Sequence, residues 1–426
     1  MSANPINGRI GQAVSGLQDW FNQRAPAFLP FYRKHMTEYY APKNFNIWYI
    51  FGVLSFVVLA NQILTGIFLT MHFKPSAAEA FASVEYIMRD VEWGWLIRYM
   101  HSTGASMFFI VVYIHMFRGL MYGSYQKPRE MVWILGMLIY LVLMAEAFMG
   151  YVLPWGQMSF WGAKVIISLF GAIPVIGNGL TEWIMGDYLP SDATLNRFFA
   201  LHVIALPLAL LLLVVLHVGA LHEVGSNNPD GVEIKKGPKG NRWSEKAPAD
   251  GVPFHPYYTV KDFFYVCCFL AIAAFVVFFA PALGGLFLEH DNFTEANRLV
   301  TPEHIKPVWY YTPFYAMLRV VPHKLSGVLV MFGAIAALFF LPWLDRGKVK
   351  SIRYRGLGFK VALAVFAISF VWLGKIGNGP GTDIVETYIG RVLTVLYFGY
   401  FIFLWVYTKF GFEKTKAVPD RVTMHE

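Results

Sequence analysis

The sequence has very little cysteine and little charge. Cys267 and Cys268 are the only cysteines in 426 residues, and adjacent cysteines form neither an ordinary structural disulfide nor the C-x-x-C-H motif that attaches haem covalently. Charged residues make up 15% of the chain and hydrophobic residues 56%, whereas soluble domains have about 25% charged residues. The apolar residues come in runs of about 20, the length that crosses a hydrocarbon layer of about 30 Å. These features exclude a soluble protein and predict a chain that crosses a membrane several times.

A search with a window of about 19 residues predicts an all-α integral membrane fold with eight transmembrane helices. The predicted spans are 46–71, 95–121, 131–153, 195–221, 262–282, 323–343, 358–375 and 387–408. The loop 345–360 carries six basic residues and one acidic residue, whereas 73–92 carries two basic and four acidic residues. Basic loops lie on the cytoplasmic side, so both termini are expected there. The formal charge of +8 therefore reflects these loops and does not indicate nucleic-acid binding.

The spans and loops divide the chain into five parts. We predict a cytoplasmic-side N-terminal segment (1–45), a first domain of four helices (46–222), a cytoplasmic-side linker (223–260), a second domain of four helices (261–410) and a C-terminal tail (411–426). Two outer loops, 155–190 and 283–322, are rich in aromatic residues. Long apolar loops of this kind are expected to lie in the interface or to cover a cavity.

Four histidines lie inside the predicted spans. His101 and His115 are 14 residues apart in the second span, a separation of about 21 Å along a helix with a net rotation of about −40°. His202 and His217 are 15 residues apart in the fourth span. The extra residue is expected to be absorbed by a kink at Pro207 or by a π-bulge. Each helix therefore presents two histidines at two depths.

Two histidines at each of two depths predict two metal centres. Copper, zinc or non-haem iron would need three or four protein ligands at one depth. A porphyrin supplies four ligands itself, so two imidazoles complete its coordination. One intramembrane histidine is most often a hydrogen-bonded core residue, but four in this register favour two non-covalent haems. We therefore expect the first four helices to form a di-haem four-helix bundle.

Glycines and arginines near the histidines support this interpretation. Gly52 and Gly66 are 14 residues apart in the first span, as are Gly136 and Gly150 in the third. Glycine permits the close approach that a flat macrocycle needs, although glycine is common in membrane helices. Three arginines are candidate partners of haem propionates, with snorkelling to lipid headgroups as the alternative: Arg98, Arg118 and Arg197.

Several longer motifs identify a family. They are ILTG (63–66), GYVLPWGQMS (150–159), RFFALH (197–202), HEVGSNNP (222–229), HPYY (255–258) and HIKPVWY (304–310). With these motifs the chain resembles cytochrome b, the membrane subunit of the quinol:cytochrome c oxidoreductase (respiratory complex III), along nearly its whole length. The photosynthetic relative divides the corresponding chain after the fourth span, so this undivided chain is more similar to the respiratory type.

The resemblance implies two haems b and two quinone sites on opposite sides of the membrane. His101 and His202 correspond to ligands of the outer, low-potential haem, and His115 and His217 to ligands of the inner, high-potential haem. The implied substrate is ubiquinol or another quinol. The implied partners are a Rieske iron–sulfur protein, a membrane-bound c-type cytochrome, membrane lipids and a second copy of the complex in a homodimer. The implied location is a bacterial inner membrane, with the mitochondrial inner membrane as the alternative.

The resemblance places quinol oxidation at the outer side. The residues it implies there are Phe148, Tyr151, Trp309, Tyr310 and Tyr315. Many members of the family have glutamate at the position of Val308, and valine accepts no proton. We hypothesise that Glu303 accepts the quinol proton instead, with Tyr151 as a second candidate. The alternative is that Glu303 is a solvated loop carboxylate.

The resemblance places quinone reduction at the inner side. The residues it implies are His222, Asp262, Lys261, Ser226 and Asn227. Histidine and aspartate are suited to deliver the protons that quinone takes up.

The function implied by these sites is a proton-translocating quinone cycle, in which one electron from quinol crosses the membrane through the two haems. Three other functions are weighed against it. They are a proton-coupled transporter without haem, a haem–copper oxidase core and a di-haem membrane anchor of a quinone-linked dehydrogenase. A transporter would show internal inverted repeats, and an oxidase would need more histidines at one depth.

Overall fold

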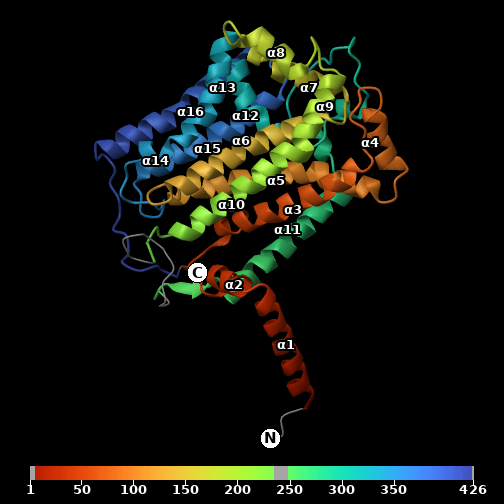
Figure 1. The fold of residues 1–426 in the computed structure, drawn as a ribbon. Coiled ribbons are helices and arrows are strands. Elements are labelled where there is room, and N and C mark those ends of the chain that lie inside the picture. The colour runs from red at the N-terminus through yellow and green to blue at the C-terminus, as the bar shows by residue number, and fades with distance from the viewer. Residues whose placement is uncertain (1–4, 235–247, 425–426) are drawn as a thin grey trace.

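The computed structural model describes residues 5–234 and 248–424, and nearly all of its regular structure is helical (Figure 1). The middle of the predicted linker, 235–247, lies outside the described residues. Within the described part, seven helical segments are long and apolar enough to cross a membrane. The all-α membrane fold expected from the sequence is thus confirmed at this level.

The seven segments match seven of the predicted spans. They are Ile47–Thr70 (η2 Ile47–Tyr49 and α3 Phe51–Thr70), α5 (Gly94–Tyr122), α6 (Glu130–Val152), Asp192–Val224 (α9 Asp192–Ala200, η4 Leu201–Ala205 and α10 Leu206–Val224), Phe254–Phe279 (η5 Phe254–Tyr258 and α11 Thr259–Phe279), α15 (Leu357–Asn378) and α16 (Ile384–Lys409). The span predicted at 323–343 corresponds to α13 (Lys324–Phe339) and the short α14 (Leu341–Leu344). With 16 residues, α13 is shorter than the roughly 20 residues that cross a bilayer unaided.

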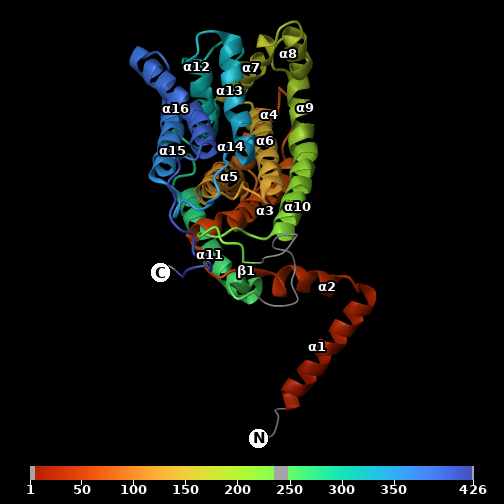
Figure 2. The ribbon, with the colours of Figure 1, turned by 90° about the vertical axis from the view of Figure 1, so that its left-hand side faces the viewer.

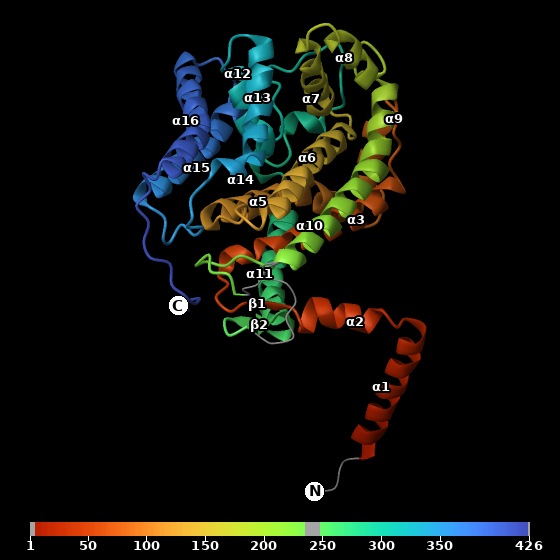
Figure 3. The ribbon, with the colours of Figure 1, turned by 60° about the vertical axis from the view of Figure 1, so that its left-hand side comes forward.

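Helices α3, α5, α6 and α10 form the first half of the molecule. In Figures 1 and 3, α3 lies along α5 and α6 along α10, in agreement with their extensive packing. The outward faces of α10 and α11 consist largely of exposed apolar side chains such as Leu208, Leu212 and Phe275. Side chains of this kind have no hydrophobic penalty against lipid tails, because the tails are equally apolar.

The second half of the molecule is a group of helices packed around buried aromatic residues. It contains α12 (Thr312–Arg319), α13, α15 and α16. Phe366 of α15 lies 4.8 Å from the Tyr397 ring and 4.7 Å from the Tyr400 ring, both on α16, measured between ring centres. The Tyr397 hydroxyl donates to the Ala334 carbonyl at 2.9 Å, which ties α16 to α13. Tyrosine can be buried here because its hydroxyl has a partner.

Both ends of the chain meet the linker at one end of the molecule, which we call the inner end, following the predicted topology. The N-terminal segment contains α1 (Pro5–Arg24), α2 (Phe28–Tyr32), η1 (Arg33–Thr37) and β1 (Tyr40–Pro42). Strand β1 pairs antiparallel with β2 (Gly251–Pro253) at the end of the linker. Arg421 of the C-terminal tail donates to Asp250 at 2.9 Å. Figure 2 shows α1, β1 and the C-terminus at this end.

The two long aromatic loops meet at the opposite, outer end. The first forms α7 (Gln157–Ser168), η3 (Phe170–Ala172) and α8 (Gly177–Met185), and the second forms η6 (Leu283–Gly285), η7 (His290–Phe293) and η8 (Trp309–Tyr311). The Ser159 amide donates to Asn292 Oδ1 at 2.8 Å, and the Ala296 amide donates to the Trp155 carbonyl at 3.0 Å. These bonds join the loops into one layer, with α4 (Ala80–Arg89) beside it.

The helix that carries His202 and His217 contains a π-helical turn. This turn, η4, covers Leu201–Ala205 and therefore includes His202, and it ends two residues before Pro207. A π turn accommodates one more residue than an α turn. It explains how a spacing of 15 residues still directs both histidines toward the neighbouring helices.

Candidate functional site

The four intramembrane histidines form two facing pairs between α5 and the α9–α10 segment. The ring centres of His101 and His202 are 6.2 Å apart, and those of His115 and His217 are 6.5 Å apart. Either separation leaves room for one metal atom bonded to a nitrogen of each ring, since a metal–imidazole bond is about 2 Å long. Among the described residues, no group of three or more His, Cys, Asp or Glu is arranged to hold a metal. Two protein ligands at each level fit a porphyrin better than a bare ion.

Hydrogen bonds orient the outer pair of rings. His101 Nδ1 lies 2.9 Å from Thr65 Oγ1. His202 Nδ1 lies 2.9 Å from the Glu146 carbonyl oxygen and 3.0 Å from Glu146 Oε1. Partners at Nδ1 fix the ring orientation and leave Nε2 available to a metal. Glu146 is an intramembrane carboxylate that the sequence reasoning missed, although an isolated charge inside an apolar run is itself a signal.

Each histidine faces one of the four glycines. A Cβ on Gly66 would lie 3.2 Å from His101 Cε1, and a Cβ on Gly150 would overlap His202 Cε1. At the other level a Cβ would lie 3.5 Å from His115 on Gly52 and 3.2 Å from His217 on Gly136. A side chain at these positions would fill the space beside each ring. The glycines on α3 and α6 therefore keep both levels open.

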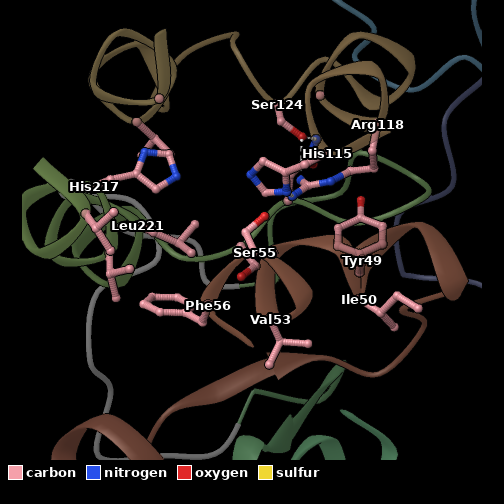
Figure 4. A pocket seen from close by; sticks show the side chains of 18 of the residues that line it. Tyr49, Ile50, Val53, Ser55, Phe56, His115, Arg118, Ser124, His217 and Leu221 are labelled. Atoms are coloured by element: carbon pink, nitrogen blue, oxygen red, sulfur yellow. Dashed lines mark hydrogen bonds between the residues drawn. The ribbon is translucent and has the colours of Figure 1, made fainter. Parts of the chain in front are cut away.

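Each level lies in a large cavity. The inner cavity, of about 460 Å³, contains His115, His217, Gly52 and Gly136 and extends to the linker. Figure 4 shows its two histidines facing each other across the space, with Tyr49 and Arg118 beside His115. The outer cavity, of about 440 Å³, contains the other two histidines and glycines and extends beneath the outer loops. Both volumes fall within the range of about 300–1,000 Å³ that is usual for ligand pockets.

Two of the three predicted arginines line these cavities. Arg98 lines the outer cavity and Arg118 the inner one. Arg118 donates to Ser124 Oγ at 3.2 Å, but its buried Nε has no hydrogen-bond partner. An unpaired buried guanidinium nitrogen fits an absent anionic group such as a haem propionate. Arg197 is exposed and donates to the Trp183 carbonyl instead, so the structure does not bring it to the outer cavity.

The predicted quinol pocket is only partly assembled along the outer cavity. Tyr151, Val308 and Tyr310 line it, and the Tyr310 ring stacks on Phe109 at 3.9 Å. The other three predicted residues do not line the cavity. Phe148 packs on Phe198, Trp309 donates to Ser106 Oγ, and the Tyr315 hydroxyl donates to the Ile305 carbonyl.

The structure separates Glu303 from this pocket and brings another carboxylate, Glu289, into contact with Tyr151 in the pocket lining. The Glu303 side chain is 90% exposed and lies 3.8 Å from His304. Glu289 is only 5% exposed and accepts a hydrogen bond of 2.6 Å from the Tyr151 hydroxyl. Burial raises the pKa of Glu289, while the bond from Tyr151 lowers it by a smaller amount. The sequence reasoning missed Glu289 because it lies 19 residues before Val308 and reaches Tyr151 only through the loop fold.

All five residues predicted for the inner quinone site line the inner cavity: His222, Asp262, Lys261, Ser226 and Asn227. Lys261 donates to the Phe45 carbonyl at 2.8 Å, and Asn227 donates to the Tyr122 carbonyl at 2.6 Å. The N-terminal segment adds His35 and Tyr39 to the same cavity. The sequence reasoning missed both, because a polar segment before the first span carries no recognisable motif.

Comparison with known proteins identifies the family. The family described as "Cytochrome b/b6/petB" matches residues 36–225, and the one described as "Cytochrome b(C-terminal)/b6/petD" matches 295–398. The cytochrome b of Allochromatium vinosum is 61% identical, over 95% of this chain and 97% of its own length. The chain belongs to the cytochrome b family. The cytochrome b of Rhodospirillum rubrum is 50% identical over 95% of each chain.

A solved structure agrees with this membership. A chain of the "Hyperthermophilic respiratory Complex III" has a TM-score of 0.85 and 39% identity, and the match covers 92% of this chain and 98% of that one. Together with the seven apolar helices, the family establishes an integral membrane protein of respiratory electron transport that binds haem b. The resemblance in the sequence motifs is thereby confirmed.

Proposed function

We propose that this chain is the di-haem subunit that oxidises quinol at the outer end and reduces quinone at the inner end, coupled to proton translocation. The observation that carries the proposal is the arrangement of the two cavities. Each contains one histidine pair and one glycine pair, and each continues to a separate set of polar residues. Leu59, Phe108 and Leu210 line both cavities, so the two levels adjoin each other along the bundle, between sites at its opposite ends.

His101 and His202 would hold the outer, low-potential haem b, and His115 and His217 the inner, high-potential one. When bound, the two haems would supply one-electron transfer over a separation of about 20 Å along the helices. Nδ1 hydrogen bonds orient the outer pair of histidines, and the four glycines, with Arg98 and Arg118 as propionate partners, would position both haems.

At the outer site, Glu289 would take the place of the glutamate that many relatives have at Val308. Its carboxylate accepts from the Tyr151 hydroxyl, so the two side chains form one proton-accepting unit. Burial raises the pKa of Glu289, which makes it a stronger base when ionised. A quinol proton accepted here would leave through the outer loops. This assignment replaces Glu303, whose exposed side chain lies away from the cavity.

At the inner site, His222 and Asp262 would deliver the two protons that quinone takes up, with Lys261, Ser226 and Asn227 positioning the ring. The site lies at the end of the molecule that holds the linker and both termini. Protons are then released outside and taken up inside, so electron transfer between the sites separates charge. This is the quinone cycle expected from the resemblance.

We further propose eight crossings, with the first four forming the di-haem bundle. Both chain ends contact the linker, and two ends on one side require an even number of crossings. Helix α13, continued by α14, supplies the eighth. The proposed setting is a bacterial inner membrane and a homodimeric complex with a Rieske protein and a membrane-bound c-type cytochrome. The described residues hold no cysteine other than the free pair Cys267 and Cys268, so an iron–sulfur cluster must belong to a partner.

The test is a haem count and a turnover assay on the purified complex. We expect two b-type centres of distinct midpoint potential per chain in redox-titrated difference spectra, together with quinol-dependent reduction of a c-type cytochrome. A proton-coupled transporter would show no reduced α-band. A di-haem dehydrogenase anchor would show both centres but no quinol:cytochrome c activity. Fewer than two haems, or no such activity, would refute the proposal.

A further inference from the structure

The inner cavity contains a histidine that the proposed function does not use. His35 belongs to η1, in the N-terminal segment, and it lines the cavity together with His222 and Tyr39. His35 is half-buried in the N-terminal segment, and His222, which is also half-buried, lies in the last turn of α10. A polar terminal segment thus contributes a side chain to the wall of the proposed quinone-reducing site.

The two histidines are in direct hydrogen-bonding contact. His35 Nδ1 lies 2.9 Å from His222 Nδ1, and their ring centres are 5.1 Å apart. Two imidazole nitrogens can form this bond only when one carries a proton and the other does not. The pair therefore holds one proton between the two rings.

Tyr39 fixes the geometry of this pair. Its ring stacks on the His222 ring with 4.5 Å between centres and an angle of 10°. Its hydroxyl lies 3.3 Å from Ser226 Oγ, and Tyr39 itself is only 4% exposed. A stacked and tethered ring prevents His222 from rotating away from His35. The contact is thus built by three elements: η1, the residues before β1, and α10.

The groups around His35 favour its uncharged form, which can relay a proton. Burial lowers the pKa of His35, Lys34 on the same turn lowers it further, and Glu223 on α10 raises it. Lys261 and Asp262 of α11 line the same cavity, and the positive charge of Arg129 acts on Tyr39. At neutral pH an imidazole with a lowered pKa is mostly uncharged, so it can accept a proton on one nitrogen while it donates from the other.

We propose that His35 is the proton-entry residue of the inner site and passes protons from the inner aqueous phase to His222. The proposal rests on the quinone-reducing function proposed above. Quinone takes up two electrons, supplied by the haem b at the inner level, and two protons. His222 releases the Nε2 proton to one quinone oxygen as its Nδ1 accepts the proton of His35 Nδ1. In the same step His35 Nε2 takes up a proton from the inner aqueous phase, so neither ring is left as an imidazolate, and both rings return to their starting tautomers before the next turnover. Asp262 supplies the second proton to the other oxygen and is reprotonated from the same phase.

The test measures oxidation of the inner haem by added ubiquinone in the purified complex, from pH 5.5 to 9, in H₂O and D₂O. We expect His35→Gln to slow this step by about tenfold or more and to increase its solvent isotope effect, because an amide cannot relay a proton. His35→Glu should restore most of the rate, since a carboxylate can. Reduction of the outer haem by quinol should be unchanged in both variants.

Two further variants separate the possible failures. Thr37→Ala changes the same turn without removing a proton carrier and should match the parent protein. His222→Gln tests the site itself. If His222→Gln is slow and His35→Gln is normal in rate and isotope effect, His35 has no relay role and the inference is wrong. If both are normal, the inner site is not where quinone is reduced, and the proposed function fails with it. A loss of rate in His35→Gln that His35→Glu does not restore would also contradict the relay.

Discussion

At the scale of single residues, the two cavities depend on glycines, which have no side chain to fill the space beside the histidine rings. Gly150 and His202 come from different helices, yet a Cβ on Gly150 would overlap the His202 ring. Real Cβ atoms do not approach a ring this closely, so no other residue fits without moving the histidine. The same argument holds with smaller overlap for Gly66 and Gly136, where the distance is 3.2 Å.

Gly150→Val should therefore remove the outer haem and leave the inner one. Valine is branched at Cβ and its χ1 is restricted in a helix, so it would displace the His202 ring. The pyridine haemochrome assay should fall from two haems to one per chain, with loss of the low-potential centre in redox titration. Gly399→Val is the control, because a Cβ there has nothing within 4 Å. Two haems of unchanged potential in Gly150→Val would contradict the assignment.

Glu289→Gln should lower the rate of quinol oxidation by roughly 100-fold, because glutamine cannot accept a proton. Burial raises the pKa of Glu289. The parent rate should therefore rise with pH through this raised value, as the carboxylate becomes ionised, and the variant should lose that dependence. Glu303→Gln is the matched control and should keep the parent profile. A second variant, Glu289→Gln with Val308→Glu, should recover part of the rate. An unchanged pH profile in Glu289→Gln would exclude its role.

At the scale of elements, ion pairs tie the inner loops to the helix ends. Arg129, at the start of α6, is 2% exposed and donates to both oxygens of Glu233 in the linker, at 2.7 and 2.9 Å. Lys350, from the loop between α14 and α15, donates to the same carboxylate at 2.6 Å. Removing one partner of a buried pair leaves an uncompensated charge, which costs about 3–5 kcal/mol. The cluster thus fixes the linker beside the inner cavity.

This cluster predicts a specific loss of stability in acid. Burial alone would raise the pKa of Glu233, but Arg129 and Lys350 together lower it from 4.5 to about 2. The stabilisation, about 3 kcal/mol by this difference, is complete above pH 4.5 and is lost as the pH falls toward 2. Glu233→Gln should lower the unfolding temperature of the complex at pH 7. Between pH 4.5 and 2 the unfolding temperature of this variant should decrease less than that of the parent protein. Circular dichroism measures both. Glu92→Gln, at an exposed position, should behave as the parent, and a parent-like Glu233→Gln would contradict the prediction.

At the scale of the whole molecule, the two histidine pairs lie in two cavities, one toward each end of the helix bundle. The outer cavity joins His101 and His202 to Tyr151 and the outer loops, and the inner cavity joins His115 and His217 to the linker end. The levels are stacked along the same helices, so neither level can reach the other side of the bilayer alone. In the proposed function, transmembrane electron transfer therefore requires both levels together.

His217→Leu should disable the inner level and leave the outer level intact. We expect it to remove the inner haem, because one of its two protein ligands is lost, and to leave the outer haem reducible by quinol. Steady-state turnover should nearly stop, while the first reduction of the outer haem should proceed. Stopped-flow spectroscopy of the purified complex measures both phases. His323→Gln, an exposed histidine, is the control. Continued turnover in His217→Leu would contradict a path through the inner level.

The sequence by itself determined the membrane fold and predicted the histidine pairs and the four glycines. These follow from periodicity along single helices, because apolar run length and the spacing of residues on one face are local properties of a helix. The residues predicted for the inner site are instead implied by the resemblance to the family. The same local reasoning explains why two predicted residues, Arg197 and Glu303, do not line the cavities in the structure. It placed Arg197 beside a haem because the residue is near His202 in sequence, and it favoured Glu303 because that residue is near Val308.

Only the tertiary structure decided which residues from distant segments meet. Glu289 reaches Tyr151 from 138 residues away, and His35 reaches His222 from 187 residues away. Contacts of this kind depend on how loops fold over a helix bundle, and no periodic pattern in either segment encodes them. The π turn at His202 belongs to the same class, because the sequence showed that one residue was extra and the fold determined where it was absorbed.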